Sequence, residues 1–205
     1  MRYPERVTII PAETQDLIRR ILGDGFLELR LAKLFTEEVP ELATKVSVEL
    51  TERGAPTTIE CEGVGPVDAL WGALIGRYAR EYQSLKSITL AGFHVSAAIE
   101  SKRHRAGLDA LAKVEVAIMN SEGRRFVFTD ESRSVTASAA RALIAVVEYF
   151  VNAERAFVTL SHARKDAMAR GRQDLVTRYT AELAEVVKST SYAEVIESLR
   201  RELGH

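Results

Sequence analysis

The side chains best suited to catalysis or metal binding in this chain are one cysteine and four histidines. Cys61 stands just before a pair of glycines, and the histidines, His94, His104, His162 and His205, are scattered. A transition-metal site needs several such ligands at short spacing, and no histidine here has a second histidine or a cysteine beside it. We therefore expect no metal site and no catalytic residues.

The short motifs of nucleotide-binding and hydrolase sites are also missing. Gly63-Val64-Gly65 lacks the third glycine of a dinucleotide-binding fingerprint and the lysine of a phosphate-binding loop. No nucleophile elbow is present. An enzyme site around Cys61, Asp68 and His94 stays open as the least favoured alternative, because no base, nucleophile and orienting group can be assigned from their spacing.

The segment from Gly63 to Asp68 indicates a binding function. Its two glycines allow a close backbone approach or a positive φ, and Pro66 suits the first turn of a helix. The amides of Val67 and Asp68 would then face outward at the positive end of that helix, which suits a carboxylate ligand. The same residues fit a plain alternative, a tight strand-to-helix turn in which Asp68 complements the helix dipole.

A short strand pair and a helix must position this turn. Val46, Val48 and Leu50 alternate with polar residues, which predicts a half-buried strand, and residues 57–62 predict its return strand. Residues 66–82 predict a helix. Its apolar face consists of Val67, Leu70, Trp71, Leu74, Tyr78 and Tyr82.

A second cycle of strands and helix follows. The apolar residues from Ile88 to Ile99 change parity across Ala91-Gly92, which predicts a bulge there. The later patterns predict, in order, a polar turn (102–107), a strand (108–118), a hairpin turn (120–123), a return strand (124–129) and a helix that begins near Ser134 and extends to Gly171. Together the cycles predict an α+β fold with two strand–helix pseudo-repeat units, an antiparallel sheet with helices on one face.

Both ends of the chain are expected to be helical extensions. Residues 12–22 predict a helix that ends at Gly23. Residues 25–38 fit both a strand and a helical stripe, and we favour the helix because Glu37, Glu38 and Pro40 would close it. Two further helices are predicted after residue 152, one through Leu175, Tyr179, Leu183 and Val186 and one from a capping box at Ser191. The expected division is an N-terminal helical segment (1–43), a central domain (44–152) and a C-terminal helical tail (153–205).

The string GVGPVDALWGAL, from Gly63 onward, resembles the G-x-G-P-V-D-A-L segment of the regulatory domain of α-isopropylmalate synthase and its citramalate synthase relatives. Residues 107–116 resemble the G-x-D-A-x-A-x-V strand of that family, and residues 137–143 resemble its A-S-x-x-A-L helix. The resemblance covers about residues 44–152, in the family's order. It implies a dimer that binds leucine or isoleucine between its strand–helix units.

The resemblance also implies which residues would bind the effector, since the family holds it near the helix starts, partly by main-chain groups. The corresponding residues of this chain are Gly63, Gly65, Pro66, Val67 and Asp68 in the first unit and Val135, Thr136 and Ala137 in the second. The chain departs from the family at Arg133 and Ser134, where an acidic residue is common. It also lacks the H-x-H metal pair of the catalytic barrel. We therefore expect a non-catalytic regulatory-like domain with no cofactor, which dimerises and binds a small amino acid or a 2-keto or hydroxy acid. It either regulates a separate synthase in trans or has been recruited to another system.

The composition limits the other classes of partner. The chain is 46% hydrophobic and 28% charged with a formal net charge of -1, which gives no general reason to expect nucleic acid or an anionic membrane. No secretory signal is evident in MRYPERVTII, and no apolar run approaches the roughly 20 residues of a membrane helix. A cytoplasmic location is expected. The alternative function is a structural or interaction protein that keeps the dimer fold without a ligand, and the apolar face of the tail favours it.

Overall fold

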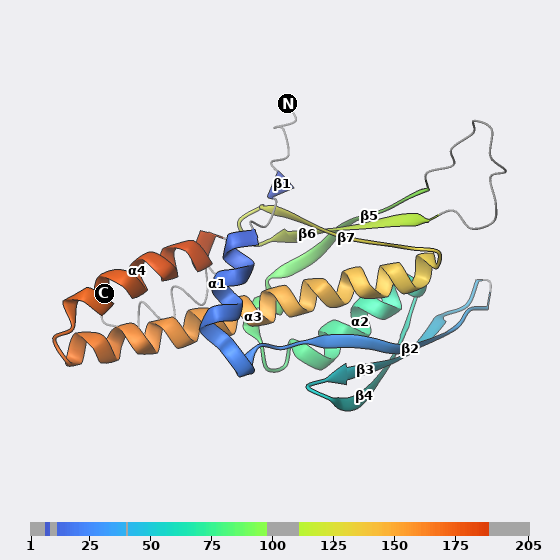
Figure 1. Ribbon diagram of the computed structural model, residues 1–205. Coiled ribbons are helices and arrows are strands. Elements are labelled where there is room, and N and C mark those ends of the chain that lie inside the picture. Colours follow the sequence, from blue (N-terminus) through green and yellow to red (C-terminus); the bar gives the residue numbers. More distant parts are fainter. Residues whose placement is uncertain (1–6, 9–11, 40, 98–110, 189–205) are drawn as a thin grey trace.

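The chain forms three layers, in which two helices lie between two β-sheets (Figure 1). The computed structural model describes residues 7–8, 12–39, 41–97 and 111–188. The elements are, in chain order, β1 (Val7–Thr8), α1 (Ala12–Leu22), η1 (Gly23–Gly25), β2 (Leu29–Glu37), β3 (Thr44–Glu52), β4 (Ala55–Gly63), α2 (Pro66–Tyr78), η2 (Gln83–Lys86), β5 (Ile88–Ala97), β6 (Ala112–Asn120), β7 (Arg125–Ser132), α3 (Val135–Ala169) and α4 (Gln173–Lys188). The predicted α+β class with two strand–helix units is confirmed.

Each strand–helix unit builds its own sheet. The first sheet has the order β2-β3-β4 and the second has the order β1-β7-β6-β5, and all pairs are antiparallel except the short parallel pair of β1 with β7. Helix α2 packs on β3 and β4, whereas α3 packs on β6 and β7 and also contacts β2. The helices therefore cover one face of each sheet and hold the two sheets together.

Strand β2 corrects the sequence interpretation, because the helix predicted over residues 25–38 is wrong. Leu29–Glu37 pairs antiparallel with β3, and the register shifts between Leu31 and Lys33. This bulge changes which face the following residues present, so that Leu31 and Leu34 both pack against the core although they stand three positions apart. The β-bulge thus gives the apolar residues of this strand the three-residue spacing that is typical of one face of a helix.

Most other predicted elements are confirmed within small boundary changes. Helix α1 has the predicted bounds, and Gly23 follows it with a φ of 49°. The bulge across Ala91-Gly92 is present, because the β5–β6 register shifts between Leu90 and Gly92. Helix α2 ends at Tyr78 rather than Tyr82, since Tyr82 already precedes η2. The predicted turn over residues 102–107 and the helix from Ser191 lie outside the described residues.

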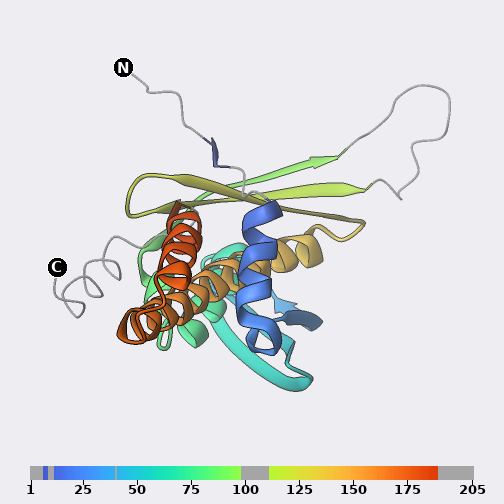
Figure 2. The ribbon, with the colours of Figure 1, turned by 60° about the vertical axis from the view of Figure 1, so that its left-hand side comes forward.

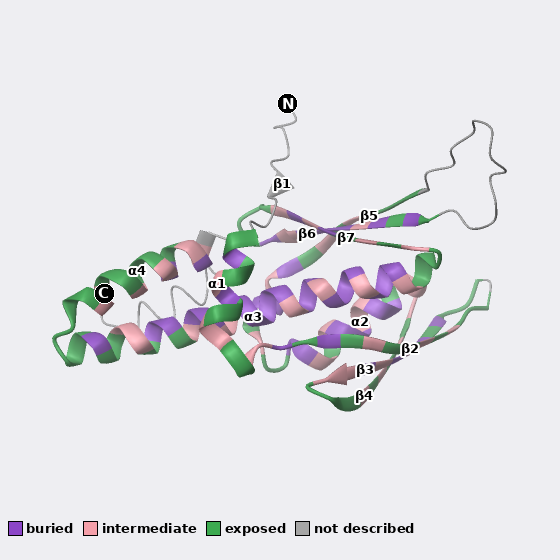
Figure 3. Cartoon of the chain, viewed as in Figure 1, coloured by how far each residue is buried: buried purple, intermediate pink, exposed green. Residues whose placement is uncertain are grey.

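The core centres on the first half of α3. This part of the helix is buried on nearly every side, as Figure 3 shows, because a sheet or another helix covers it in each direction. Phe126 and Phe128 of β7 pack against Tyr149 and Phe150 of α3, and the rings of Phe126 and Phe150 meet edge to face at 5.4 Å between centroids. Such aromatic pairs add specific geometry to the burial of apolar area.

The second half of α3 continues beyond the sheets and is covered by α4. The two helices are joined by a turn at Gly171, whose φ is 68°, and α4 returns along α3 to reach α1 (Figure 2). Two side-chain contacts join α4 to α1: Thr14 donates to Glu185 at 3.1 Å, and Arg20 pairs with Glu182 at 2.9 Å. Among the described residues, no helix is both long and apolar enough to cross a membrane.

Candidate functional site

The starts of α2 and α3 lie beside one hollow, which we call the helix-start hollow. Its volume is about 690 Å³, within the range of small-molecule sites. Pro66 contributes from α2, and the start of α3 contributes Ser134, Thr136, Ala137 and Arg141. The remaining wall comes from β2 and its end: Leu31, Ala32, Lys33, Leu34, Thr36 and Glu38.

The two glycines that precede α2 differ in what they require. A Cβ atom at Gly63 would lie 2.6 Å from the backbone nitrogen of Ala69, so that only glycine lets the end of β4 approach the helix so closely. Gly65 has an extended backbone with a φ of -169°, and a Cβ atom there would meet no atom within 4 Å. The first glycine therefore serves the fold, and nothing in the described fold restricts the second to glycine.

The start of α2 has backbone amides that the helix itself does not satisfy. Asp68 accepts a hydrogen bond from the amide of Val64 at 3.1 Å, and the carbonyl of Gly65 accepts from Ala69 at 2.9 Å. No side chain caps the helix from Gly65, and Pro66 has no amide hydrogen. The amides of Val67 and Asp68 have no partner within the helix, because the first amides of any α-helix lack one. This helix start thus offers N–H donors together with the positive end of its dipole.

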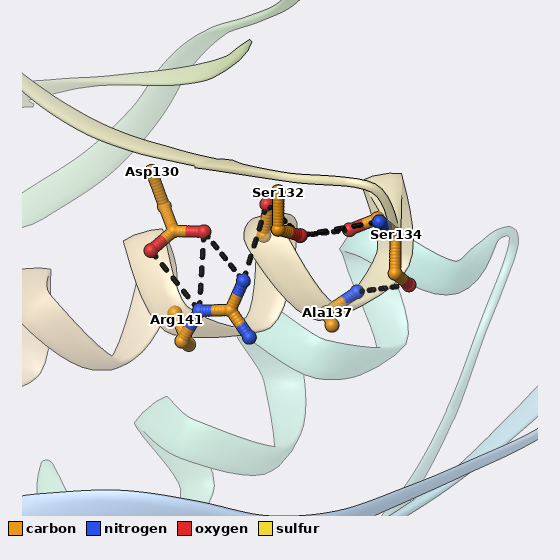
Figure 4. A network of polar contacts seen from close by, with 6 residues as sticks. Asp130, Ser132, Ser134, Ala137 and Arg141 are labelled. Carbon is orange, nitrogen blue, oxygen red and sulfur yellow. Dashed lines mark hydrogen bonds and ion pairs between the residues drawn. The ribbon is translucent and has the colours of Figure 1, made fainter. Parts of the chain in front are cut away.

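The start of α3 is fixed by a network of polar side chains (Figure 4). Ser134 caps the helix by accepting from the amide of Ala137 at 3.2 Å, and Ser132 contacts Ser138 at 2.8 Å. Arg141 pairs with Asp130 through two nitrogens, at 3.0 and 2.7 Å. The hydrogen bond from Arg141 holds the pKa of Asp130 below its ordinary value, so this carboxylate stays charged. The network anchors the positive end of α3 against β7.

The wall from β2 contains a polar atom without a partner. The hydroxyl oxygen of Thr36 is buried and makes no hydrogen bond within the described part of the chain. Lys33 in the same strand pairs with Glu49 at 3.3 Å, so its charge is partly compensated. A buried hydroxyl without a partner beside a hollow is typical of a place where water or a ligand completes the hydrogen bonding. The sequence interpretation missed Thr36 and Lys33, because it placed them in a helix.

The eight residues predicted to bind an effector do not all line one hollow. Pro66, Thr136 and Ala137 line the helix-start hollow, whereas Gly63 and Asp68 line a neighbouring hollow of about 680 Å³ beside residues 38–39 and 41–44. Neither hollow is lined by Gly65, Val67 or Val135. Glu38 lines both hollows, so they adjoin at the end of β2.

The residues considered for an enzyme site are dispersed. Cys61 lies in β4, with its sulfur beneath α2 close to Gly72, and its thiol donates to the carbonyl of Glu62. His94 lies in β5, in the other sheet, opposite Glu115. Across the described ranges, no three side chains of His, Cys, Asp or Glu are grouped so that they could hold a metal ion. These residues form no shared site with Asp68.

Comparison with known families agrees with this arrangement. The family model described as the LeuA allosteric (dimerisation) domain matches residues 8–151. The match begins before the range of the sequence motifs, so it includes α1 and β2, and it ends within α3. No curated protein matches the chain. The resemblance noted from the motifs is confirmed, and the chain belongs to the LeuA allosteric (dimerisation) domain family.

Proposed function

We propose that this chain is a regulatory domain that dimerises and binds a small carboxylate effector, such as a branched-chain amino acid or a 2-keto acid, at the helix-start hollow. One observation carries the proposal: the starts of α2 and α3, which belong to different units, line the same hollow. Two helix dipoles then present their positive ends to one small volume, and Thr136 of α3 contributes an amide without an intrahelical partner.

The walls of the hollow suit the rest of such an effector. Leu31, Ala32 and Leu34 of β2 supply apolar surface for a branched side chain, and Thr36 supplies a hydroxyl without a partner in the described chain. Glu38 supplies a carboxylate that can accept from an ammonium group. An α-amino acid carries these three features: a carboxylate, an ammonium group and an apolar side chain.

The proposed role is to transmit effector binding to a synthase of the isopropylmalate type that is carried on a separate chain. Membership of an allosteric domain family supports this role. Because the effector would touch both units, its binding would stabilise one arrangement of α2 relative to α3. Such a differential interaction is what a ligand needs in order to shift a conformational equilibrium.

The binding step is tested by thermal unfolding of the full chain with leucine, isoleucine, valine and their 2-keto acids. At a hundredfold excess over Kd, a ligand that binds only the folded state stabilises it by about 2.7 kcal/mol. The matched variants are Thr136→Glu and Thr136→Gln, because Thr136 is exposed in the first turn of α3. The glutamate should abolish the response by repelling the carboxylate, and the glutamine of similar size should largely keep it.

A flat response of the unaltered chain across the whole panel would contradict effector binding. An equal response of Thr136→Glu and Thr136→Gln would place the binding elsewhere. Regulation in trans requires a second measurement, in which the activity of a synthase is followed with and without this chain at saturating effector. No change in activity at any ratio of the two proteins would contradict the regulatory role while leaving effector binding intact.

The second candidate function is an interaction module without an effector. Large apolar side chains remain exposed at the end of the first sheet where β2 and β4 finish, and they include Val64 (91% exposed), Leu42 (67%) and Phe35 (59%). Exposed apolar surface of this kind is typical of a protein–protein contact. This function predicts self-association that does not depend on any ligand in the panel.

A further inference from the structure

Another cavity lies away from the helix-start hollow, between α1, the start of β2, β7 and α3. Its volume is about 420 Å³, within the range of small-ligand sites. Its lining combines aromatic rings, carboxylates and a short apolar stretch, and none of its residues lines the helix-start hollow. The two sites can therefore be occupied and tested separately.

The floor of the cavity holds a carboxylate that has no ion pair with any residue that the structure describes. Glu148 of α3 is half-buried, and one of its oxygens accepts a hydrogen bond from the amide of Leu29. Burial raises the pKa of the Glu148 carboxyl, while this amide and nearby Arg19 act in the opposite direction. A buried carboxylate is costly to the fold unless a cation compensates it, so its presence beside a cavity indicates a binding role.

The charges around Glu148 leave the cavity negative. Asp16 of α1 also lines it and has no ion-pair partner among the described side chains. Glu28 lines it too, but Arg30 pairs with Glu28 at 2.9 Å. The single basic residue of the lining, Arg19, stacks its guanidinium on the ring of Phe26 at 4.2 Å. Arg19 keeps its charge in this contact and offsets one carboxylate, so Glu148 and Asp16 together leave one net negative charge for a ligand of positive charge.

The other walls suit the stem of such a ligand. Phe128 and Tyr149 present aromatic rings, which attract cations as well as apolar groups, and Ile18, Leu29 and Ala145 complete an apolar surface. Asn152 closes the cavity and is itself satisfied, since its amide bonds both the N–H and the carbonyl of Leu27. The wall from α1 is held in turn by α4, through the contacts of Thr14 and Arg20.

We propose that this cavity binds a small organic cation, namely a primary ammonium group on a short alkyl chain, with the ammonium at Glu148 and Asp16 and the chain against Phe128, Tyr149 and Leu29. The charge preference is opposite to that of the helix-start hollow. The cavity is thus a second site with a different ligand class, and α1 couples it to the α3–α4 hairpin.

The test is calorimetric titration of the full chain with n-butylamine and 1,4-diaminobutane near neutral pH. Butanol and butyrate serve as matched probes, because they have the same chain length without the positive charge. Saturable binding of the amines, with neither butanol nor butyrate binding, is the expected result. No binding of either amine would overturn the proposal, as would equal binding of butanol.

Glu148→Gln is the decisive variant, because the glutamine oxygen can still accept from Leu29 while the charge is removed. The amine affinity should fall at least about tenfold, which corresponds to about 1.4 kcal/mol. Asp16 lies on the exposed side of α1, so Asp16→Asn should weaken amine binding without affecting the fold. This second variant tests the site even where Glu148→Gln folds poorly. Amine binding unchanged in both variants would show non-specific attraction to surface acids and would overturn the proposal.

Thr136→Glu separates this inference from the proposed function. That variant should keep amine binding, and Glu148→Gln should keep the response to carboxylate effectors. If the unaltered chain binds amines but no carboxylate effector, the helix-start hollow is rejected as a binding site and the cavity at Glu148 stands. If it binds carboxylate effectors but no amine, the reverse holds.

Discussion

Two glycines that are equivalent in the sequence motif have unequal roles in the structure. Gly63 lies where the end of β4 meets the first turn of α2, and the neighbouring backbone leaves no room for a side chain. Gly65 is two residues later, and a Cβ atom there would point into open space. The sequence indicated that a tight turn exists but could not separate the steric glycine from the other, because that distinction depends on where α2 packs.

The first prediction follows from this difference. Gly63→Ala should lower the free energy of unfolding by about 1–3 kcal/mol, because the new methyl group would displace the backbone at Ala69. Gly65→Ala is the matched control and should change stability by less than about 0.5 kcal/mol. Urea unfolding followed by circular dichroism measures both. Equal effects of the two substitutions would show that the approach of β4 to α2 is looser than the structure has it.

The second prediction concerns the pH dependence that Glu148 contributes. Desolvation raises its pKa in the folded protein, so between the ordinary and the raised pKa the folded state holds a proton that the unfolded state has lost. The contribution of this group to stability is therefore greatest at low pH and falls as pH rises through that window. Glu148→Gln removes the titration, so the free energy of unfolding of the variant should rise relative to that of the unaltered protein as pH increases.

Urea midpoints measured for both proteins from about pH 4 to about pH 8 give this difference, in which the other titrating groups cancel. A constant difference would show that Glu148 titrates as an ordinary exposed glutamate. A difference of the opposite sign would show that the unaltered chain has a cation beside Glu148 in the absence of added ligand.

At the scale of elements, local sequence patterns predict an element correctly where it presents one apolar face along its length. They fail where a strand changes the face that it presents to the core. Residues 12–22 predicted α1 to the residue, because a single stripe and a closing glycine define it. Strand β2 was predicted as a helix, since its bulge places Leu31 and Leu34 on the same face. The repetition of three strands and a helix in the second unit was a signal that could have corrected this, because the first unit otherwise has only two strands.

The site was only partly predictable for the same reason. The helix starts at Pro66 and Ser134 are visible in the sequence, but the wall that β2 contributes to their hollow is not, since it depends on the misassigned strand. The cavity at Glu148 was not foreseen at all. Its floor and walls come from segments about 120 residues apart that only the tertiary fold brings together, as the bond between Leu27 and Asn152 illustrates at a separation of 125 residues.

The third prediction concerns the anchor of β2 on α3. Asn152 is 1% exposed, and its side chain accepts from the amide of Leu27 at 2.7 Å and donates to its carbonyl at 2.8 Å. Asn152→Leu should destabilise the fold by about 2–6 kcal/mol, because two buried backbone groups lose their partner at about 1–3 kcal/mol each. Thr159→Leu, at an exposed position of the same helix, is the matched control and should change stability by less than about 0.5 kcal/mol. Urea unfolding measures the stability of both variants. Equally small losses of stability would mean that water satisfies the backbone groups of Leu27 once the Asn152 amide is removed.

At the scale of the whole molecule, the family match and the helical hairpin occupy different parts of the chain. The match ends at residue 151, whereas α3 continues to Ala169 and α4 returns to Lys188. The hairpin buries its own apolar face, since Phe157 and Leu160 of α3 and Leu183 and Val186 of α4 are all at most 8% exposed. The division at residue 152 remains a prediction. The structure adds that the hairpin also supports α1, which belongs to the matched region.

The last prediction asks which part of the molecule carries self-association. A dimer made by the strand–helix units should survive removal of the hairpin's second helix, whereas a dimer made by the tail should dissociate. Val186→Asp in the full chain tests this, because Val186 is fully buried and a carboxylate there would detach α4 without shortening the chain. Sedimentation at several protein concentrations gives the mass. We expect the mass of a dimer for the unaltered chain and for Val186→Asp, because the match to the dimerisation domain family covers residues 8–151 and does not include α4.

Hydrogen exchange of the same variant checks that α4 has in fact detached. The amides of α1 should exchange faster, because Thr14 and Arg20 lose their partners, while those of β6 and β7 should keep their protection. Ala184→Asp, at an exposed position of α4, is the matched control and should leave both regions unchanged. A monomeric Val186→Asp with protected sheets would assign self-association to the hairpin and favour the interaction module over the regulatory domain. A dimer with exposed α1 amides would instead assign assembly to the strand–helix units and leave α4 as a support for the cavity at Glu148.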